Sequence, residues 1–136
     1  MKHHANDYIL NNKVPIPCNA FGTYQAAEGK SAEVIGTAIR AGYRHFDTAS
    51  IYGTERYVAE AIEKSGIPRG EFFLTSKVWK EDMGYEQTKV AFAKSLEQLN
   101  TSYLDLYLIH WPIPTPGYKD WKTLDLETWR AMEELY

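Results

Sequence analysis

Short apolar runs alternate with amphipathic stretches along most of the chain. Apolar runs without a helical period predict strands at residues 7–10, 14–17, 19–24, 43–46, 72–78 and 104–110. Apolar positions at helical spacing predict helices at residues 31–41, 54–65 and 85–99, and another from about residue 126. Gly42 and Gly66 fit the ends of the first two helices, because glycine readily adopts the left-handed backbone that ends a helix.

The order of these elements is a small hairpin followed by four strand–helix pairs. Such alternation is typical of an α/β fold in which helices cover a parallel sheet. The strand at residues 19–24 is expected to be buried. Thr54 is expected to cap the helix at residues 54–65. The last helix is expected after a long Pro/Gly loop, with an apolar stripe of Trp129, Met132 and Tyr136.

Ionisable residues end three of the predicted strands. Asp47, Lys77 and His110 each follow an apolar run, and Tyr52 lies in the loop after the first of them. In a (β/α) barrel, the carboxyl ends of the strands are where the chemistry is placed. Structural roles are also open to them: a loop cap for Asp47 with Tyr52 packed beneath, an ion pair for Lys77, and a hydrogen-bonded core position for His110. Because buried parallel strands normally stay apolar to their ends, the set favours a functional site.

The four side chains suggest acid catalysis at a carbonyl. A phenol has an ordinary pKa of about 10, and the ammonium of Lys77 is expected to ease deprotonation of Tyr52. Asp47 would hold Lys77 charged, and His110 would orient the carbonyl of a substrate. The attacking group would then come from a cofactor, for which a hydride donor is the natural choice.

No phosphate-binding motif of the common nucleotide folds is present in the sequence. The chain has neither a G-x-G-x-x-G nor a Walker A pattern. Gly22, Thr23 and Tyr24, at the end of a predicted strand, are the one candidate for a close approach of the backbone to a cofactor.

Composition excludes several classes of partner. The chain has 136 residues, enough for one domain, and a net charge of −3, which argues against nucleic acid. The longest apolar run, residues 106–109, is far too short to span a bilayer. Residues 1–13 lack the apolar segment of a signal peptide, and a single cysteine, Cys18, fits a reducing compartment such as the cytoplasm.

Three motifs together carry a resemblance to a known family. Residues 42–52 (GYRHFDTASIY) are similar to the first signature of the aldo-keto reductase superfamily. Residues 74–79 (LTSKVW) resemble its lysine strand, and residues 95–99 with 103–112 (SLEQL and YLDLYLIHWP) resemble its second signature. Within the family, the chain looks most like the bacterial reductases of the 2,5-diketogluconate reductase type.

The resemblance implies a fold, a reaction and a set of roles. The fold is a TIM (β/α)8 barrel closed at its bottom by the N-terminal hairpin, and the reaction is NADPH-dependent reduction of aldehydes and ketones. By position, Tyr52 would be the general acid, tuned by Lys77 and Asp47, and His110 would orient the carbonyl. The cofactor would lie beside Gly22, Thr23, Tyr24 and Asp47. The substrate pocket would be lined by Tyr24, Trp79, His110 and Trp111.

Three positions or features depart from the family pattern. Ala20 stands where the family usually has glycine, and Thr54 stands where it has Asn or Asp, although a threonine is still expected to cap the helix. An eight-stranded barrel takes about 250 residues, so residues 1–136 are expected to form the N-terminal half of one barrel domain. Open edges of parallel strands invite pairing, so a second copy or a complementary C-terminal half is expected to cover them.

Two other functions remain open on the sequence. A lysine at a strand end can form a Schiff base with a carbonyl substrate, which would make the protein a lyase that uses Lys77. The same fold also serves as a cofactor-sensing regulatory subunit of ion channels, so a non-catalytic half-barrel module is a further alternative.

Overall fold

The computed structural model describes residues 7–26, 31–112 and 119–136. Its strands are β1 (Asp7–Ile9), β2 (Pro15–Pro17), β3 (Ala20–Gly22), β4 (His45–Asp47), β5 (Phe73–Val78) and β6 (Leu106–Ile109). Its α-helices are α1 (Ser31–Arg40), α2 (Glu55–Ser65), α3 (Tyr85–Gln98) and α4 (Trp121–Leu135). Single turns of 3₁₀ helix lie at Ser50–Tyr52, Arg69–Glu71 and Lys80–Asp82. The predicted order of strands and helices is confirmed. Residues 113–118, in the predicted Pro/Gly loop, lie outside the described residues.

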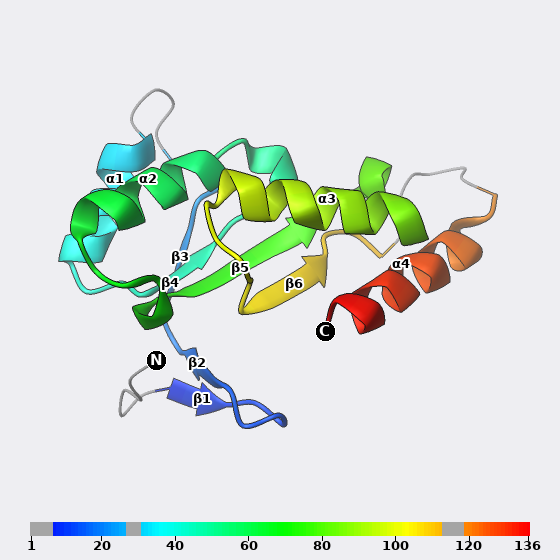
Figure 1. Ribbon diagram of the computed structural model, residues 1–136, viewed down its shortest axis with the longest axis horizontal. Coiled ribbons are helices and arrows are strands. Elements are labelled where there is room, and N and C mark those ends of the chain that lie inside the picture. Colours follow the sequence, from blue (N-terminus) through cyan, green and yellow to red (C-terminus); the bar gives the residue numbers. More distant parts are fainter. Residues whose placement is uncertain (1–6, 27–30, 113–118) are drawn as a thin grey trace.

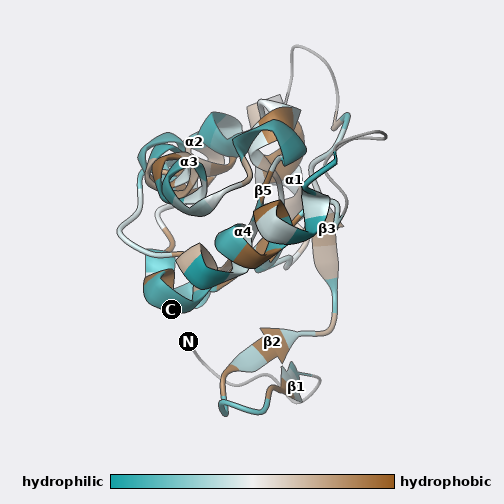
Figure 2. Ribbon diagram, turned by 90° about the vertical axis from the view of Figure 1, so that its right-hand side faces the viewer, coloured by the Kyte–Doolittle hydropathy of each residue, from teal (hydrophilic) through white to brown (hydrophobic). Residues whose placement is uncertain are grey.

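A parallel sheet organises the molecule. Its strand order is β3-β4-β5-β6, and each strand is parallel to its neighbour. Helices α1, α2 and α3 lie over one face of this sheet, above it in Figure 1. The antiparallel hairpin β1–β2 lies apart from them, below the sheet in the same view. The view in Figure 2 shows the same hairpin apart from the helices and the sheet, joined to them by the chain that leads into β3. The predicted α/β architecture is therefore present.

The hydrophobic core lies between the sheet and the first two helices. Ile35 of α1, Val58 of α2 and Phe46 of β4 are fully buried in it. Neighbouring residues of a strand point to opposite faces of a sheet. Phe46 and Leu74 therefore face the helices, and the residues on either side of them in β4 and β5 face the other way.

The first strand of the sheet is not buried, contrary to the prediction. Ala20 and Gly22 are exposed, and Phe21 is half-buried. The reason is position, because no strand pairs with the outer side of β3 in the part of the chain that the structure describes. An apolar sequence indicates a strand, but it does not say whether the strand lies in the centre of a sheet or at its edge.

Helix α4 begins earlier and buries a different face than predicted. It starts at Trp121 rather than near residue 126, and Trp129 and Tyr136 are 55% and 93% exposed. Thr128 and Ala131 are buried instead. These small residues allow a close approach to the start of α3, where the Gly84 amide donates a hydrogen bond of 2.8 Å to Thr128 Oγ1.

The ends of α2 show one confirmed prediction and one correction. Gly66 ends the helix with a φ of 67°, as predicted. Thr54 directly precedes α2, but its side chain makes no capping hydrogen bond. Its hydroxyl lies 2.8 Å from that of Thr23 and 3.0 Å from that of Thr48. The predicted cap is therefore wrong, because the buried hydroxyl finds its partners in neighbouring side chains rather than in the helix backbone.

Candidate active site

The four strand-end residues meet at one edge of the sheet. Asp47 is the last residue of β4, Lys77 lies near the end of β5, and His110 directly follows β6. Tyr52 reaches the same place from the 3₁₀ turn after β4. The Tyr52 hydroxyl lies 3.0 Å from His110 Nε2, and the Lys77 ammonium lies 2.5 Å from Asp47 Oδ1. The parallel register of the strands thus brings together residues that are up to 63 positions apart in sequence (110 − 47).

Lys77 is held in place by two hydrogen bonds. Its Nζ donates to Asp47 Oδ1 at 2.5 Å and to the Thr48 carbonyl at 2.9 Å, and its side chain is 13% exposed. The same nitrogen lies 5.4 Å from the centre of the Tyr52 ring. A Schiff base needs a lysine nitrogen that is free to attack a carbonyl carbon, whereas this nitrogen is engaged by the Asp47 carboxylate and the Thr48 carbonyl. The arrangement therefore disfavours a nucleophilic role for Lys77.

The pKa of the Tyr52 phenol is raised, not lowered as the sequence suggested. Burial is the largest cause, followed by the negative charge of Asp47 and the nearby phenol of Tyr24. The expectation placed the Lys77 charge next to the phenol, but Asp47 neutralises much of that charge at 2.5 Å. Tyr52 is accordingly protonated at neutral pH, which is the form that can donate a proton.

His110 packs between the phenol and the first tryptophan. Its ring meets those of Tyr52 and Trp79 edge-on, with interplanar angles of 89° in both cases. Its Nδ1 is buried and has no hydrogen-bond partner among the described residues. A buried N–H without an acceptor costs more free energy than a buried nitrogen acceptor without a donor, so the proton is favoured on Nε2 rather than on Nδ1. The Nε2–H then donates to the Tyr52 oxygen.

Aromatic rings surround the polar centre. The Tyr24 ring lies 4.9 Å from that of Tyr52, and Trp79 lies 5.1 Å from both His110 and Trp111, measured between ring centres. Tyr24 and Trp111 are exposed, and Trp79 is half-buried. Because the core does not enclose these rings, they form an open apolar wall beside the Tyr52 hydroxyl.

The two small residues at the end of β3 have different environments. Gly22 is exposed, and a Cβ built there would meet no atom within 4 Å, so the backbone is open to a close approach. Thr23 is fully buried, and its hydroxyl lies 2.8 Å from Thr54 Oγ1 and donates to the Asp47 carbonyl at 3.2 Å. The Thr23 side chain therefore supports the strand that carries Asp47 and does not line the open site.

Sequence reasoning missed three supporting hydroxyls. The Thr48 and Thr54 side chains complete the buried cluster with Thr23, and Ser50 Oγ donates to the Lys77 carbonyl at 3.2 Å. The signal that could have found them is the run of polar residues in the loop directly after an ionisable strand end.

In the described residues, no cluster of His, Cys, Asp or Glu is arranged to hold a metal ion. A search of the same residues finds no helix long and apolar enough to cross a membrane.

Comparison with known proteins agrees with this geometry. The family model described as "Aldo/keto reductase family" matches residues 19–136. Glyoxal reductase of Bacillus subtilis is 50% identical over 128 residues, which cover 93% of this chain and 44% of that protein. The chain spans about half the length of the curated relatives it matches.

Solved structures give the same assignment. An aldo/keto reductase from Brucella melitensis has a TM-score of 0.86 and 46% identity, covering 95% of this chain and 48% of that one. An aldo-keto reductase of Bombyx mori, in complex with NADP, has a TM-score of 0.83 and 35% identity, covering 98% and 47%. The hairpin and the four strand–helix pairs thus correspond to half of an aldo-keto reductase TIM barrel, as predicted. This chain belongs to the aldo/keto reductase family.

Proposed function

We propose that this chain carries the catalytic half of an NADPH-dependent reductase that converts aldehydes and ketones to alcohols. The observation that supports the proposal most is the Tyr52–His110 contact of 3.0 Å beside the Lys77–Asp47 ion pair. A protonated phenol at the strand ends, in an aromatic surround, suits protonation of a carbonyl oxygen. The family assignment makes an oxidoreductase the expected class of enzyme.

Each residue of the centre has a proposed task. Tyr52 donates its proton to the carbonyl oxygen as that oxygen becomes an alkoxide. His110, with its proton on Nε2, positions the phenol and the substrate oxygen. Asp47 holds Lys77, and the ammonium 5.4 Å from the Tyr52 ring stabilises the phenolate that remains after the transfer.

The cofactor site rests on the end of β3 and the end of β4. When bound, NADPH supplies the hydride that reduces the carbonyl carbon. The residues present fit such a group, because Gly22 is open to close approach, Tyr24 is exposed and Asp47 is half-buried at the same edge. The relative from Bombyx mori is described in complex with NADP, which supports this choice of cofactor. Thr23 acts by holding Asp47 in place.

The proposed substrate pocket lies at the tryptophan wall. Trp79 and Trp111 are adjacent rings, and Trp79 meets the His110 ring edge-on, which gives an apolar surround suited to a small carbonyl compound. Glyoxal is the first substrate to assay, because a relative with 50% identity is named glyoxal reductase.

The free, exposed Cys18 is compatible with the proposed cytoplasmic location.

The test of this function is the Tyr52→Phe variant. Glyoxal-dependent oxidation of NADPH is measured for the chain combined with the C-terminal half of Bacillus subtilis glyoxal reductase. We expect kcat to fall by about 100-fold or more, since a general acid typically contributes that much, while NADPH binding is retained. Tyr43→Phe is the matched control, because Tyr43 packs against Phe21 on the helix side of the sheet, and it is expected to leave kcat unchanged.

Three outcomes would contradict the proposal. Equal turnover by Tyr52→Phe would remove the general-acid role. Binding of NADPH by the unsubstituted protein without reduction of any carbonyl would indicate the non-catalytic, cofactor-sensing module. Trapping of a carbonyl substrate on Lys77 by borohydride would indicate the lyase.

A further inference from the structure

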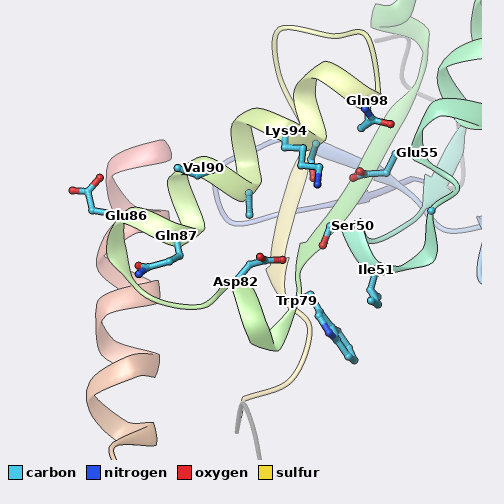
Figure 3. A pocket seen from close by; sticks show the side chains of 13 residues that line it. Ser50, Ile51, Glu55, Trp79, Asp82, Glu86, Gln87, Val90, Lys94 and Gln98 are labelled. Atoms are coloured by element: carbon cyan, nitrogen blue, oxygen red, sulfur yellow. The ribbon is translucent and has the colours of Figure 1, made fainter.

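A second concave site lies behind the loop that carries Tyr52. It is a groove of about 700 Å³ between the turn Ser50–Tyr52, the start of α2 and one side of α3. Figure 3 shows Glu55 and Lys94 pointing into this space from two sides, with Ser50, Asp82 and Trp79 below them. Apart from Trp79 and from Ser50, whose hydroxyl donates to the Lys77 carbonyl, the residues of this groove have no role in the proposed reduction. We propose that the groove binds a small primary alkylammonium ion, with Glu55 as its counter-charge.

The first ground is a buried carboxylate that makes no ion pair, although Lys94 points into the same groove. Glu55 is 5% exposed, and its Oε1 accepts a hydrogen bond of 2.6 Å from Ser76. It makes no ion pair with any residue that the structure describes. Buried charges in proteins are normally paired or bound to a cation, because desolvation of an isolated carboxylate is costly. A cationic group in the groove would meet this requirement.

The second ground is an unused hydroxyl in the same groove. Ser95 of α3 is fully buried and lines the groove, and its Oγ has no hydrogen-bond partner among the described residues. The buried hydroxyl of Tyr107, which does not line the groove, is also without a hydrogen-bond partner among the described residues. Burial raises the pKa of Tyr107, and the charges of Glu55 and Asp82 raise it further. An ammonium carries three donors, so it can satisfy Glu55 and the Ser95 oxygen together.

The rest of the lining selects a cation with a short carbon chain. Asp82 and Glu86 add negative charge, whereas Lys94 is the one cation of the lining and is exposed to water. Ile51 and Val90 supply apolar surface for a hydrocarbon tail. A free carboxylate or phosphate would face three acidic side chains, so anions are expected to bind weakly.

The groove is connected to the proposed active site by short contacts. Ser50 and Ile51, which line it, directly precede Tyr52, and Ser50 Oγ donates to the carbonyl of Lys77 at 3.2 Å. Ser76, the partner of Glu55, is the residue before Lys77. An occupant of the groove would therefore lie against the residues before Tyr52 and, through Glu55 and Ser76, be linked to the residue before Lys77.

The test is a calorimetric titration of the chain with n-butylammonium chloride, with n-butanol and sodium butyrate as probes of the same length. We expect saturable binding of the amine alone. Glu55→Gln should weaken it at least tenfold, whereas Glu86→Gln, at an exposed carboxylate of the same lining, should change it less than twofold. Binding is the readout, so the result is independent of reductase activity.

Ser95→Ala is the second variant, because it removes one hydroxyl and leaves the charge of the protein and nearly all of the side-chain volume unchanged. It tests the amine site if Glu55→Gln fails to fold. We expect a loss of affinity of several-fold. Equal affinity in Glu55→Gln, equal affinity in Ser95→Ala, or binding of butyrate or butanol as tight as that of the amine would each overturn the proposal, as would the absence of any saturable binding.

Discussion

At the scale of single residues, the distribution of charge around Tyr52 is the main departure from expectation. Lys77, near the end of β5, forms an ion pair with Asp47 at 2.5 Å. The carboxylate offsets much of the electrostatic effect of Lys77 on the phenol of Tyr52. Burial and Asp47 then raise the pKa of Tyr52. This arrangement favours the protonated form of Tyr52, which is the form that the proposed role as a proton donor requires.

Replacing Asp47 with Asn should lower the pKa of Tyr52. The substitution removes one negative charge that raises this pKa and frees the Lys77 ammonium to favour the phenolate. In the unsubstituted protein the phenol stays protonated past its ordinary pKa of about 10. The loss of reduction at high pH should therefore begin at a lower pH in Asp47→Asn. The measurement is the ultraviolet difference titration of Tyr52, obtained by subtracting the curve of Tyr52→Phe, together with the pH–rate profile. A pKa that rises on substitution would show that the carboxylate acts in another way.

At the scale of elements, a buried ion pair joins the strands that carry the lysine and the histidine. Arg69, before β5, donates to Asp105 Oδ2 at 2.8 Å, and the Leu74 amide donates to the same oxygen at 2.9 Å. Arg69 also donates to the Phe72 and Tyr103 carbonyls. The two strand starts are thereby held together, at the opposite end of the strands from the proposed site.

Asp105→Ala should destabilise the fold by about 3 kcal/mol, because it leaves a largely buried guanidinium and a strand amide without their acceptor. The side chains of Arg69 and Asp105 are 21% and 10% exposed, so water replaces the carboxylate poorly. Urea unfolding followed by circular dichroism measures the effect. Glu60→Ala, which removes the exposed ion pair with Lys64, is the matched control and should change stability by at most about 0.5 kcal/mol. Equal effects of the two substitutions would mean that the buried pair is no stronger than a surface one.

At the scale of the whole molecule, the sheet has open edges, and several large apolar side chains are exposed. No strand pairs with the outer sides of β3 and β6 within the described residues. Leu108 of β6 and Leu126 and Trp129 of α4 are exposed, as are Tyr8 and Ile9 of the hairpin. Open strand edges with exposed apolar neighbours are prone to associate. This is the basis for the proposal that a second copy or a complementary half covers them.

The chain studied alone should therefore associate with itself, and adding the C-terminal half of a family barrel should replace this association with a one-to-one complex. Light scattering after gel filtration measures the mass, and quenching of tryptophan fluorescence measures NADPH binding. We expect NADPH binding only in an assembly that covers both edges. A monodisperse monomer that binds NADPH as tightly as the complex would contradict the proposal.

The sequence by itself determined the order of the elements and the residues at the strand ends. Helical spacing, glycine at helix ends and apolar runs are local signals, and they were sufficient for the fold class. The meeting of Asp47, Lys77 and His110 also followed, because parallel strands in register bring their carboxyl ends to one edge.

Only the tertiary structure decided which partner each side chain finds. The burial of Thr23, the hydroxyl cluster that takes Thr54 away from its helix, the edge position of β3 and the buried face of α4 all depend on neighbours distant in sequence. So does the direction in which the pKa of Tyr52 shifts, since it follows from the burial of the phenol and from the nearby negative charge of Asp47. Periodicity reports the side of an element that is apolar, whereas distances of a few ångströms between side chains, which set hydrogen bonds and charge interactions, arise only when the chain is packed.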